Sequence, residues 1–190
     1  MPAIHILRLP FMAALLAMTA GCALSMGAVS DVRIRHVPAA EVDMQGKMAG
    51  CCTHMTWLRV DFVSDMDYAD RARHSIQVWV HYGWCPMTDD RSFAVSSLFS
   101  ERGVVDSGTT LTPVNGDAKR PLYAYHAFLP ESSPARPHPA PGESDGAYDL
   151  RKASGDLCIA VRGGEMWTGR RGLSKGGVVP EAALTGAAGR

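Results

Sequence analysis

The sequence lacks an excess of charge of either sign. Its 190 residues carry 19 lysines and arginines against 19 aspartates and glutamates, so the formal net charge at pH 7 is zero. Attraction to nucleic acid or to an anionic lipid surface requires net or clustered positive charge, and this balance provides no case for either. We therefore expect no nucleic-acid partner.

Two other features are scarce, namely long apolar runs and helical periodicity. The apolar run at residues 11–20 has about ten residues, whereas a membrane-spanning helix needs roughly twenty. Beyond this run, apolar residues almost never recur at the three- and four-residue spacing of an amphipathic helix. The sequence therefore argues against a membrane-spanning helix and against a helical fold.

The N-terminus has the composition of an export signal. Residues 1–8 contain one cation and no acid, the apolar run follows, and small residues precede Cys22. The segment Thr19-Ala20-Gly21-Cys22 resembles the lipobox of bacterial prelipoproteins, although leucine is usual where Thr19 stands. The resemblance implies cleavage before Cys22 and attachment of acyl chains, palmitate among them, to this residue. An ordinary cleaved signal with an incidental thiol at Cys22 is the alternative.

The resemblance also implies a location and a domain organisation. In enteric bacteria, alanine rather than aspartate after the acylated cysteine implies the outer membrane, with the protein facing the periplasm; Ala23 fits. Several acyl chains are needed for stable anchoring, because one chain binds only marginally. We expect a signal peptide at 1–21, a tether at 22–30, one β-rich domain at 31–180 and a flexible tail at 181–190.

Alternation of apolar and polar residues predicts the fold class. The segments 57–63 and 75–84 alternate clearly and are joined by about ten residues, which suggests an antiparallel pair. Residues 93–99 are ambiguous between strand and helix, and the proline-rich stretch 130–142 predicts an exposed loop. We expect a mainly β protein, an antiparallel β-sandwich or open barrel with long loops. All predicted strands are 31–37, 57–63, 75–84, 121–129 and 156–162.

With Cys22 assigned to lipid, four cysteines are left. An even number in an exported chain predicts two disulfides. Three pairings exist, and a bond between the neighbours Cys51 and Cys52 is the least expected, because it closes a strained ring. The other two pairings would connect Cys51 and Cys52 to Cys85 and Cys158.

The chain contains one sequence that matches a catalytic motif. Residues 172–176 read Gly-Leu-Ser-Lys-Gly, the G-x-S-x-G pattern of the nucleophile elbow in α/β-hydrolases. That elbow needs a buried strand before Ser174, a helix after it and a histidine further along the chain. The flanking residues are rich in glycine, and no histidine follows His138. We therefore predict no enzymatic activity and no cofactor.

Soft metal ligands are concentrated in one segment. Thioether, thiolate and imidazole groups suit Cu(I), although their spacing here is not that of a copper motif we recognise. The alternative interpretation is a methionine-lined edge of the core together with disulfides. The ligand candidates are Met44, Met48, His54 and Met55, with Cys51 and Cys52 among them.

The loop after residue 64 contains Asp65, Asp67 and Asp70, which are hard oxygen ligands that could hold Ca²⁺. An EF-type loop requires an acid or amide where Ala69 stands and a glycine where Asp70 stands. We therefore favour a solvated acidic turn.

The alternation in residues 75–84 places Trp79 and His81 on the face opposite Ile76, Val78, Val80 and Tyr82. An exposed tryptophan on a strand is typical of a partner-binding surface. The alternative, which we favour here, is that a second sheet or the proline-rich loop covers this face.

These features predict a membrane-anchored, periplasm-facing lipoprotein. We expect it to be a non-enzymatic binding or structural module of the cell envelope, with an envelope protein as a partner; an inhibitor or immunity protein would be one form. A periplasmic copper or other metal-binding protein that uses residues 44–55 is the alternative.

Overall fold

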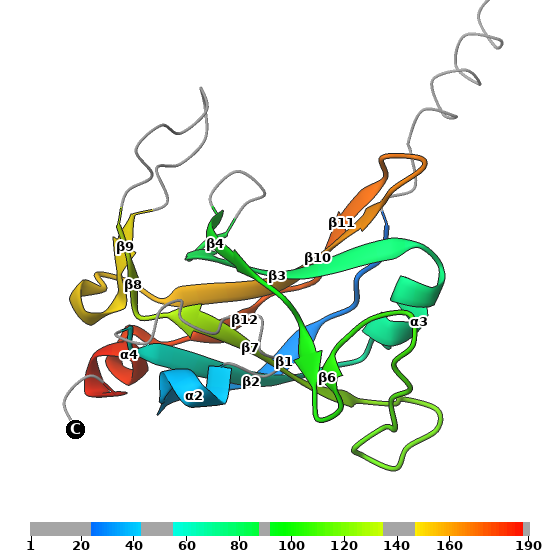
Figure 1. Ribbon diagram of the computed structural model, residues 1–190, viewed down its shortest axis with the longest axis horizontal. Helices are drawn as coiled ribbons and strands as arrows, with labels where there is room; N and C mark the ends of the chain where they lie inside the picture. The colour runs from blue at the N-terminus through cyan, green and yellow to red at the C-terminus, as the bar shows by residue number, and fades with distance from the viewer. Residues whose placement is uncertain (1–23, 43–54, 88–91, 135–146, 188–190) are drawn as a thin grey trace, which may run out of the picture.

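Two antiparallel sheets pack face to face in the computed structural model, which describes residues 24–42, 55–87, 92–134 and 147–187 (Figure 1). The first sheet has the order β1-β2-β7-β5-β6, and the second has the order β11-β10-β3-β4, with β12 also paired to β10. The architecture confirms the predicted mainly β sandwich.

The elements follow one another along the chain with short helices at the connections. The strands are β1 (Val29–Val37), β2 (Trp57–Ser64), β3 (Ile76–Trp84), β4 (Ser92–Ser96), β5 (Phe99–Ser100), β6 (Gly103–Val104), β7 (Tyr123–Pro130), β8 (Ser132–Ser133), β9 (Tyr148–Asp149), β10 (Leu157–Glu165), β11 (Arg171–Leu173) and β12 (Gly177–Val179). The helices are α2 (Ala39–Val42), α3 (Tyr68–Arg73), the 3-10 turn η1 (Leu150–Lys152) and α4 (Glu181–Ala187).

The five predicted strands correspond to β1, β2, β3, β7 and β10. The predicted pairing of 57–63 with 75–84 is wrong, because α3 carries the chain from β2 in the first sheet to β3 in the second. β2 instead lies between β1 and β7, and β3 lies between β10 and β4. The ambiguous segment 93–99 forms β4 and then crosses at Leu98 to β5 in the other sheet.

The main core lies between the sheets and consists of the inward-facing residues of the strands. Val60 and Phe62 of β2 face Val80 and Tyr82 of β3 within one cluster. A second cluster lies on the outer side of the first sheet, where α2 covers β1, β2 and β7. Strand β7 is therefore buried on both faces over residues 125–129. The second cluster comprises Val37, Val42, Trp57 and Phe128, with Ala39, Met55 and Phe99 against it.

Residues 24–30 belong to the folded domain, whereas the sequence predicts a tether there. Met26 is 1% exposed, and its carbonyl accepts a hydrogen bond from the Tyr68 hydroxyl at 2.8 Å. Glycines provide the necessary space: a Cβ on Gly163 would lie 2.3 Å from the Met26 sulfur, and one on Gly172 would lie 1.9 Å from the Leu24 carbonyl oxygen. Leu24 and Met26 therefore pack closely against the glycines of β10 and β11.

The C-terminal end differs from its prediction in the same way. Residues 181–187 form α4, in which Leu184 is buried in the main core, and the Glu181 N–H donates to the Asp156 carboxylate at 2.9 Å. The flexible tail predicted from residue 181 is therefore wrong for this helix.

Cys85 and Cys158 form a disulfide, with their Cα atoms 5.1 Å apart. The prediction that each of them bonds to Cys51 or Cys52 is wrong. The physical reason is the register of two neighbouring strands, since Trp84 at the end of β3 is opposite Leu157 at the start of β10. Cys22, Cys51 and Cys52 lie outside the described residues.

None of the helices in the described ranges is long and apolar enough to cross a membrane.

Candidate partner-binding surface

The outer face of the second sheet carries the residues that the sequence singles out for a partner. Strand alternation turns Ile76, Val80 and Tyr82 into the core and leaves Trp79 and His81 on the other side. Trp79 is 37% exposed, so the described residues cover it only in part. His81 is half-buried beside it.

A groove of about 510 Å³ runs over this face, along β3, β10 and the start of β11. Trp79 is opposite Arg162 in the β3–β10 register, and His81 is opposite Val95 of β4. The Trp79 ring lies over the backbone of Gly164, where a Cβ would be 3.8 Å from the ring. The absence of a side chain at Gly164 therefore leaves the groove open next to an aromatic surface.

The groove combines apolar and basic groups. Trp79, Val95 and Met166 are three of its lining residues, and each exposes a large part of its apolar surface. Among its described lining residues, Glu165 is the one acid, and three are arginines, namely Arg162, Arg170 and Arg171. A surface of this kind suits a partner that is partly apolar and carries negative charge.

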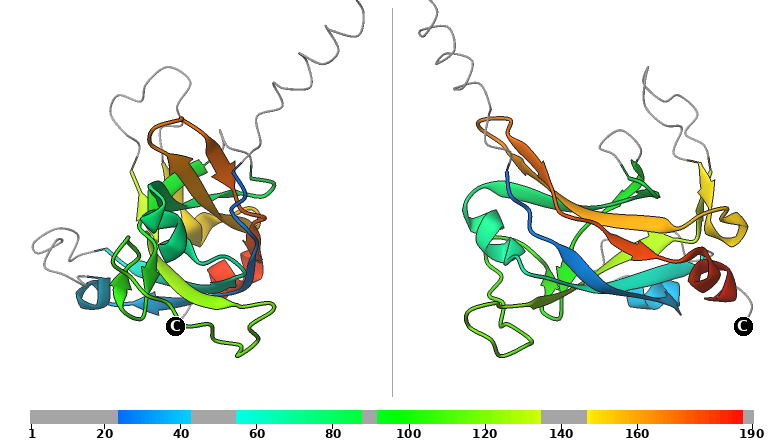
Figure 2. Two further views of the ribbon diagram at one scale, coloured as in Figure 1. Left: turned by 90° about the vertical axis from the view of Figure 1, so that its right-hand side faces the viewer. Right: turned by 180° about the vertical axis from the view of Figure 1, so that it is seen from behind.

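The β10–β11 hairpin continues this surface beyond the sheet (Figures 1 and 2). Trp167 at its tip is 84% exposed, the largest exposure among the large apolar residues of the described chain. The backbone closes the hairpin with hydrogen bonds from the Glu165 N–H to the Arg170 carbonyl (2.8 Å) and from the Gly169 N–H to the Glu165 carbonyl (3.1 Å). Trp167 is thus exposed from an ordered turn.

On the outer face of the first sheet, charged side chains are paired with one another. Arg35 and Arg59 are directly opposite each other on β1 and β2, and Glu41 of α2 forms ion pairs with both. Arg59 also donates to Asp61 at 2.7 Å. The hydrogen bond from Arg35 lowers the pKa of the Glu41 carboxyl. Glu41 of α2 therefore offsets the repulsion between the guanidinium groups of Arg35 and Arg59.

His126 lies on this same face and is almost completely buried. Phe99 stacks on its ring at 5.6 Å, and its Nε2 atom is buried without a hydrogen-bond partner in the described residues. Burial, reinforced by the nearby Arg59 cation, lowers the pKa of His126 to about 4. The adjoining hollow of about 300 Å³ has no serine, threonine or cysteine among its described lining residues. His126 therefore has no nucleophile there to activate.

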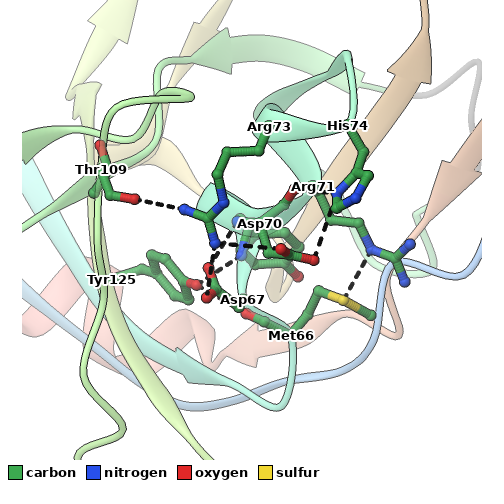
Figure 3. A network of polar contacts seen from close by, with 9 residues as sticks. Met66, Asp67, Asp70, Arg71, Arg73, His74, Thr109 and Tyr125 are labelled. Atoms are coloured by element: carbon green, nitrogen blue, oxygen red, sulfur yellow. Dashed lines mark hydrogen bonds and ion pairs between the residues drawn. The ribbon is translucent and has the colours of Figure 1, made fainter.

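The acidic loop around α3 has its carboxylates engaged with the protein (Figure 3). Asp67 caps the helix by accepting from the Asp70 N–H at 2.9 Å, and Asp70 accepts from Arg73 at 3.2 Å. Asp65 accepts from the Ala28 N–H at 2.7 Å. The carboxylates therefore cap a helix and hold the N-terminal segment, which is a structural role.

Ser174, the centre of the G-x-S-x-G match, is buried between β11 and β12. Its hydroxyl accepts a hydrogen bond from the Val161 N–H at 2.9 Å, and its own N–H donates to the Val161 carbonyl at 2.9 Å. The geometry is that of a strand-pairing residue, and the strand–turn–helix of a nucleophile elbow is not formed here.

The predicted metal ligands lie largely outside the described residues. Met44, Met48 and His54 are not described, and Met55 packs against the apolar cluster beneath α2. Among the residues that are described, no group of three or more histidine, cysteine, aspartate or glutamate side chains is placed to hold a metal ion.

Sequence patterns single out Trp79 and His81 but miss Arg162, Met166 and Trp167. Two adjacent apolar residues, Met166 and Trp167, between Gly164 and Gly169 are the available signal, because a hairpin turn flanked by glycines has no core in which to bury them. No family model, no curated protein and no solved structure matches the chain.

Proposed function

We propose that this protein is a lipoprotein of the bacterial cell envelope, anchored through Cys22, that binds another envelope protein and performs no catalysis. The groove beside Trp79 is the observation that carries the proposal. Exposed aromatic and arginine side chains are over-represented in protein interfaces, and a central tryptophan often contributes most to binding.

The chemistry of the groove supports one class of partner. Arg162, which is opposite Trp79, favours a partner segment with carboxylates, and the exposed surfaces of Trp79 and Val95 favour apolar side chains next to them. An inhibitor or immunity protein that blocks an incoming toxin would be one such module. The size of the chain and its proposed location at the membrane are what support that form.

The test is site-specific photocrosslinking in intact cells. A photoreactive amino acid replaces Val95 at the groove or, as the matched control, the equally exposed Val114 outside it. We expect a single crosslinked protein from position 95 that position 114 does not give and that Trp79→Ala abolishes. The same crosslinks from both positions, or crosslinks unaffected by Trp79→Ala, would contradict the proposal.

The anchor has its own test. Processing of the precursor should be blocked by globomycin, and Cys22→Ser should remove acyl chains detected by mass spectrometry. A mature protein that begins after another residue and carries no lipid would refute the anchor without bearing on the groove.

A second candidate function, metal binding, gains support from one observation. Because Cys85 bonds to Cys158, neither can bond to Cys51 or Cys52, so the two thiols among the soft ligands are not consumed in that way. Metal analysis of protein purified without chelator, together with a free-thiol count, tests this candidate. Two disulfides per chain and no bound copper would end it.

A further inference from the structure

The N-terminal segment is fixed to the sheet directly beside the β10–β11 hairpin. The Leu24 N–H donates to the Arg171 carbonyl at 3.4 Å, and the Leu24 carbonyl lies over Gly172 of β11. Cys22 precedes Leu24 by two residues, so the Cα atoms of the two residues are at most about 7 Å apart. Any lipid on Cys22 is therefore attached close to this hairpin.

The hairpin carries the side chains that favour a bilayer interface. Met166 is 62% exposed and Trp167 is 84% exposed, and the exposed residues Arg170 and Arg171 follow them, Arg171 as the first residue of β11. Tryptophan is enriched at the boundary between headgroups and acyl chains, because its ring is apolar and its N–H is polar. Arginine can lay its aliphatic stem along apolar groups and keep its guanidinium among headgroups.

The turn that presents these side chains is ordered. Besides the two backbone bonds that close it, the Thr168 hydroxyl donates to the Glu165 carboxylate at 2.5 Å, and the Arg170 N–H donates to the Thr168 hydroxyl at 3.2 Å. Gly169 has a φ of +69°, a conformation that glycine adopts without strain. Little backbone conformational entropy is therefore lost when Trp167 enters an interface.

We infer that the tip of the β10–β11 hairpin, residues 166–171, rests in the headgroup region of the bilayer that holds the Cys22 lipid, and so fixes the orientation of the domain on the membrane. This inference depends on the proposed acylation of Cys22. The start of the described chain at Leu24 and the hairpin lie at the same end of the molecule, and α4 lies at the opposite end (Figures 1 and 2). The domain then stands on the membrane by this end.

The position of the anchor favours a bilayer over a protein as the occupant. A lipid attached within about 7 Å of Leu24 brings headgroups to the hairpin in every anchored molecule. The part of the groove around Trp79 lies further along β3 and is left for the protein partner, since Trp79 is opposite Arg162 and not opposite the hairpin tip.

The experiment uses full-length protein expressed in a bacterial host, purified from membranes in detergent and checked for acyl chains by intact mass. It is reconstituted into vesicles of phosphatidylcholine and phosphatidylglycerol, with or without bromine on the acyl chains. Bromine quenches tryptophan only at short range. We expect brominated vesicles to reduce the emission, Trp167→Phe to abolish this loss, and the control Trp79→Phe to leave it intact.

The outcomes separate the two proposals. An unacylated mass refutes the anchor and, with it, this inference. An acylated protein whose emission is equal in both kinds of vesicle refutes the bilayer contact alone, and so does a loss that persists in Trp167→Phe. A photoreactive group at position 167 that crosslinks to a protein and not to lipid also overturns the inference.

Discussion

The two sheets of the sandwich have outer faces that are built in opposite ways. On the first sheet, α2 covers Trp57 and Phe128, and Glu41 pairs with the two arginines that oppose each other. On the second sheet, Trp79 is partly exposed beside a groove whose described lining residues include more arginines than acids. A face whose aromatic residues are covered and whose charges are paired contributes to stability, whereas the other face leaves Trp79 partly exposed, where a partner can contact it.

The largest effect should come from removing an aromatic ring from the covered face. Phe128→Ala deletes a side chain that is 4% exposed and should lower the free energy of unfolding by about 4 kcal/mol. Trp79→Ala on the open face should lower it by about 1–2 kcal/mol, since 37% of that side chain is already exposed to water. Urea unfolding followed by circular dichroism measures both. Equal losses of unfolding free energy in the two variants would show that Trp79 contributes as much to stability as Phe128.

Acid should destabilise the covered face through His126. Its pKa of about 4 in the folded protein lies below the ordinary value of 6.5, so between these values the unfolded chain binds a proton that the folded protein does not. Stability from neutral His126 is full above pH 6.5 and falls as the pH decreases towards 4, by roughly 3 kcal/mol in all.

The measurement is urea unfolding at a series of pH values, for the wild type and for His126→Phe. The variant keeps a ring against Phe99 but cannot titrate, so its stability should decline less between pH 6.5 and 4. Parallel curves for the two proteins would contradict the prediction and would show that His126 is solvated when the protein is folded.

The smallest effect concerns the ion pairs of the covered face. Glu41→Gln leaves Arg35 and Arg59 opposite each other without their shared anion, and we expect a loss of about 0.5–1 kcal/mol that shrinks in high salt. Glu101→Gln is a suitable control, because Glu101 is exposed and has no ion pair with the described residues. An equal loss of unfolding free energy in both variants would contradict a stabilising role for the ion pairs of Glu41.

Local alternation was enough to predict the five longest of the described strands and the exposed side of β3. The core residues of β2 and β3, and the outward placement of Trp79 and His81, follow from a period of two residues along one strand. The fold class follows because several such strands occur in a chain that has almost no helical periodicity.

Features that depend on distant segments could not be predicted in this way. The Cys85–Cys158 bond requires the β3–β10 register, which joins positions 73 residues apart in the sequence. The segment around Met26 resembles a linker because most of its residues are small. Its packing becomes visible only in the structure, where the missing side chains of Gly163 and Gly172 leave room for Met26 and Leu24. Leu184 likewise becomes a core residue only once α4 docks against the sandwich.

The packing of Leu24 and Met26 against Gly172 and Gly163 also has a consequence for engineering. The chain enters the domain beside β11, whereas α4 lies at the far end (Figure 1). A fluorescent protein or an affinity tag fused after α4 would be separated from the entry point by the length of the sandwich. An insertion between residues 24 and 29 would instead disrupt the core, so reporters on this protein belong at the C-terminal end.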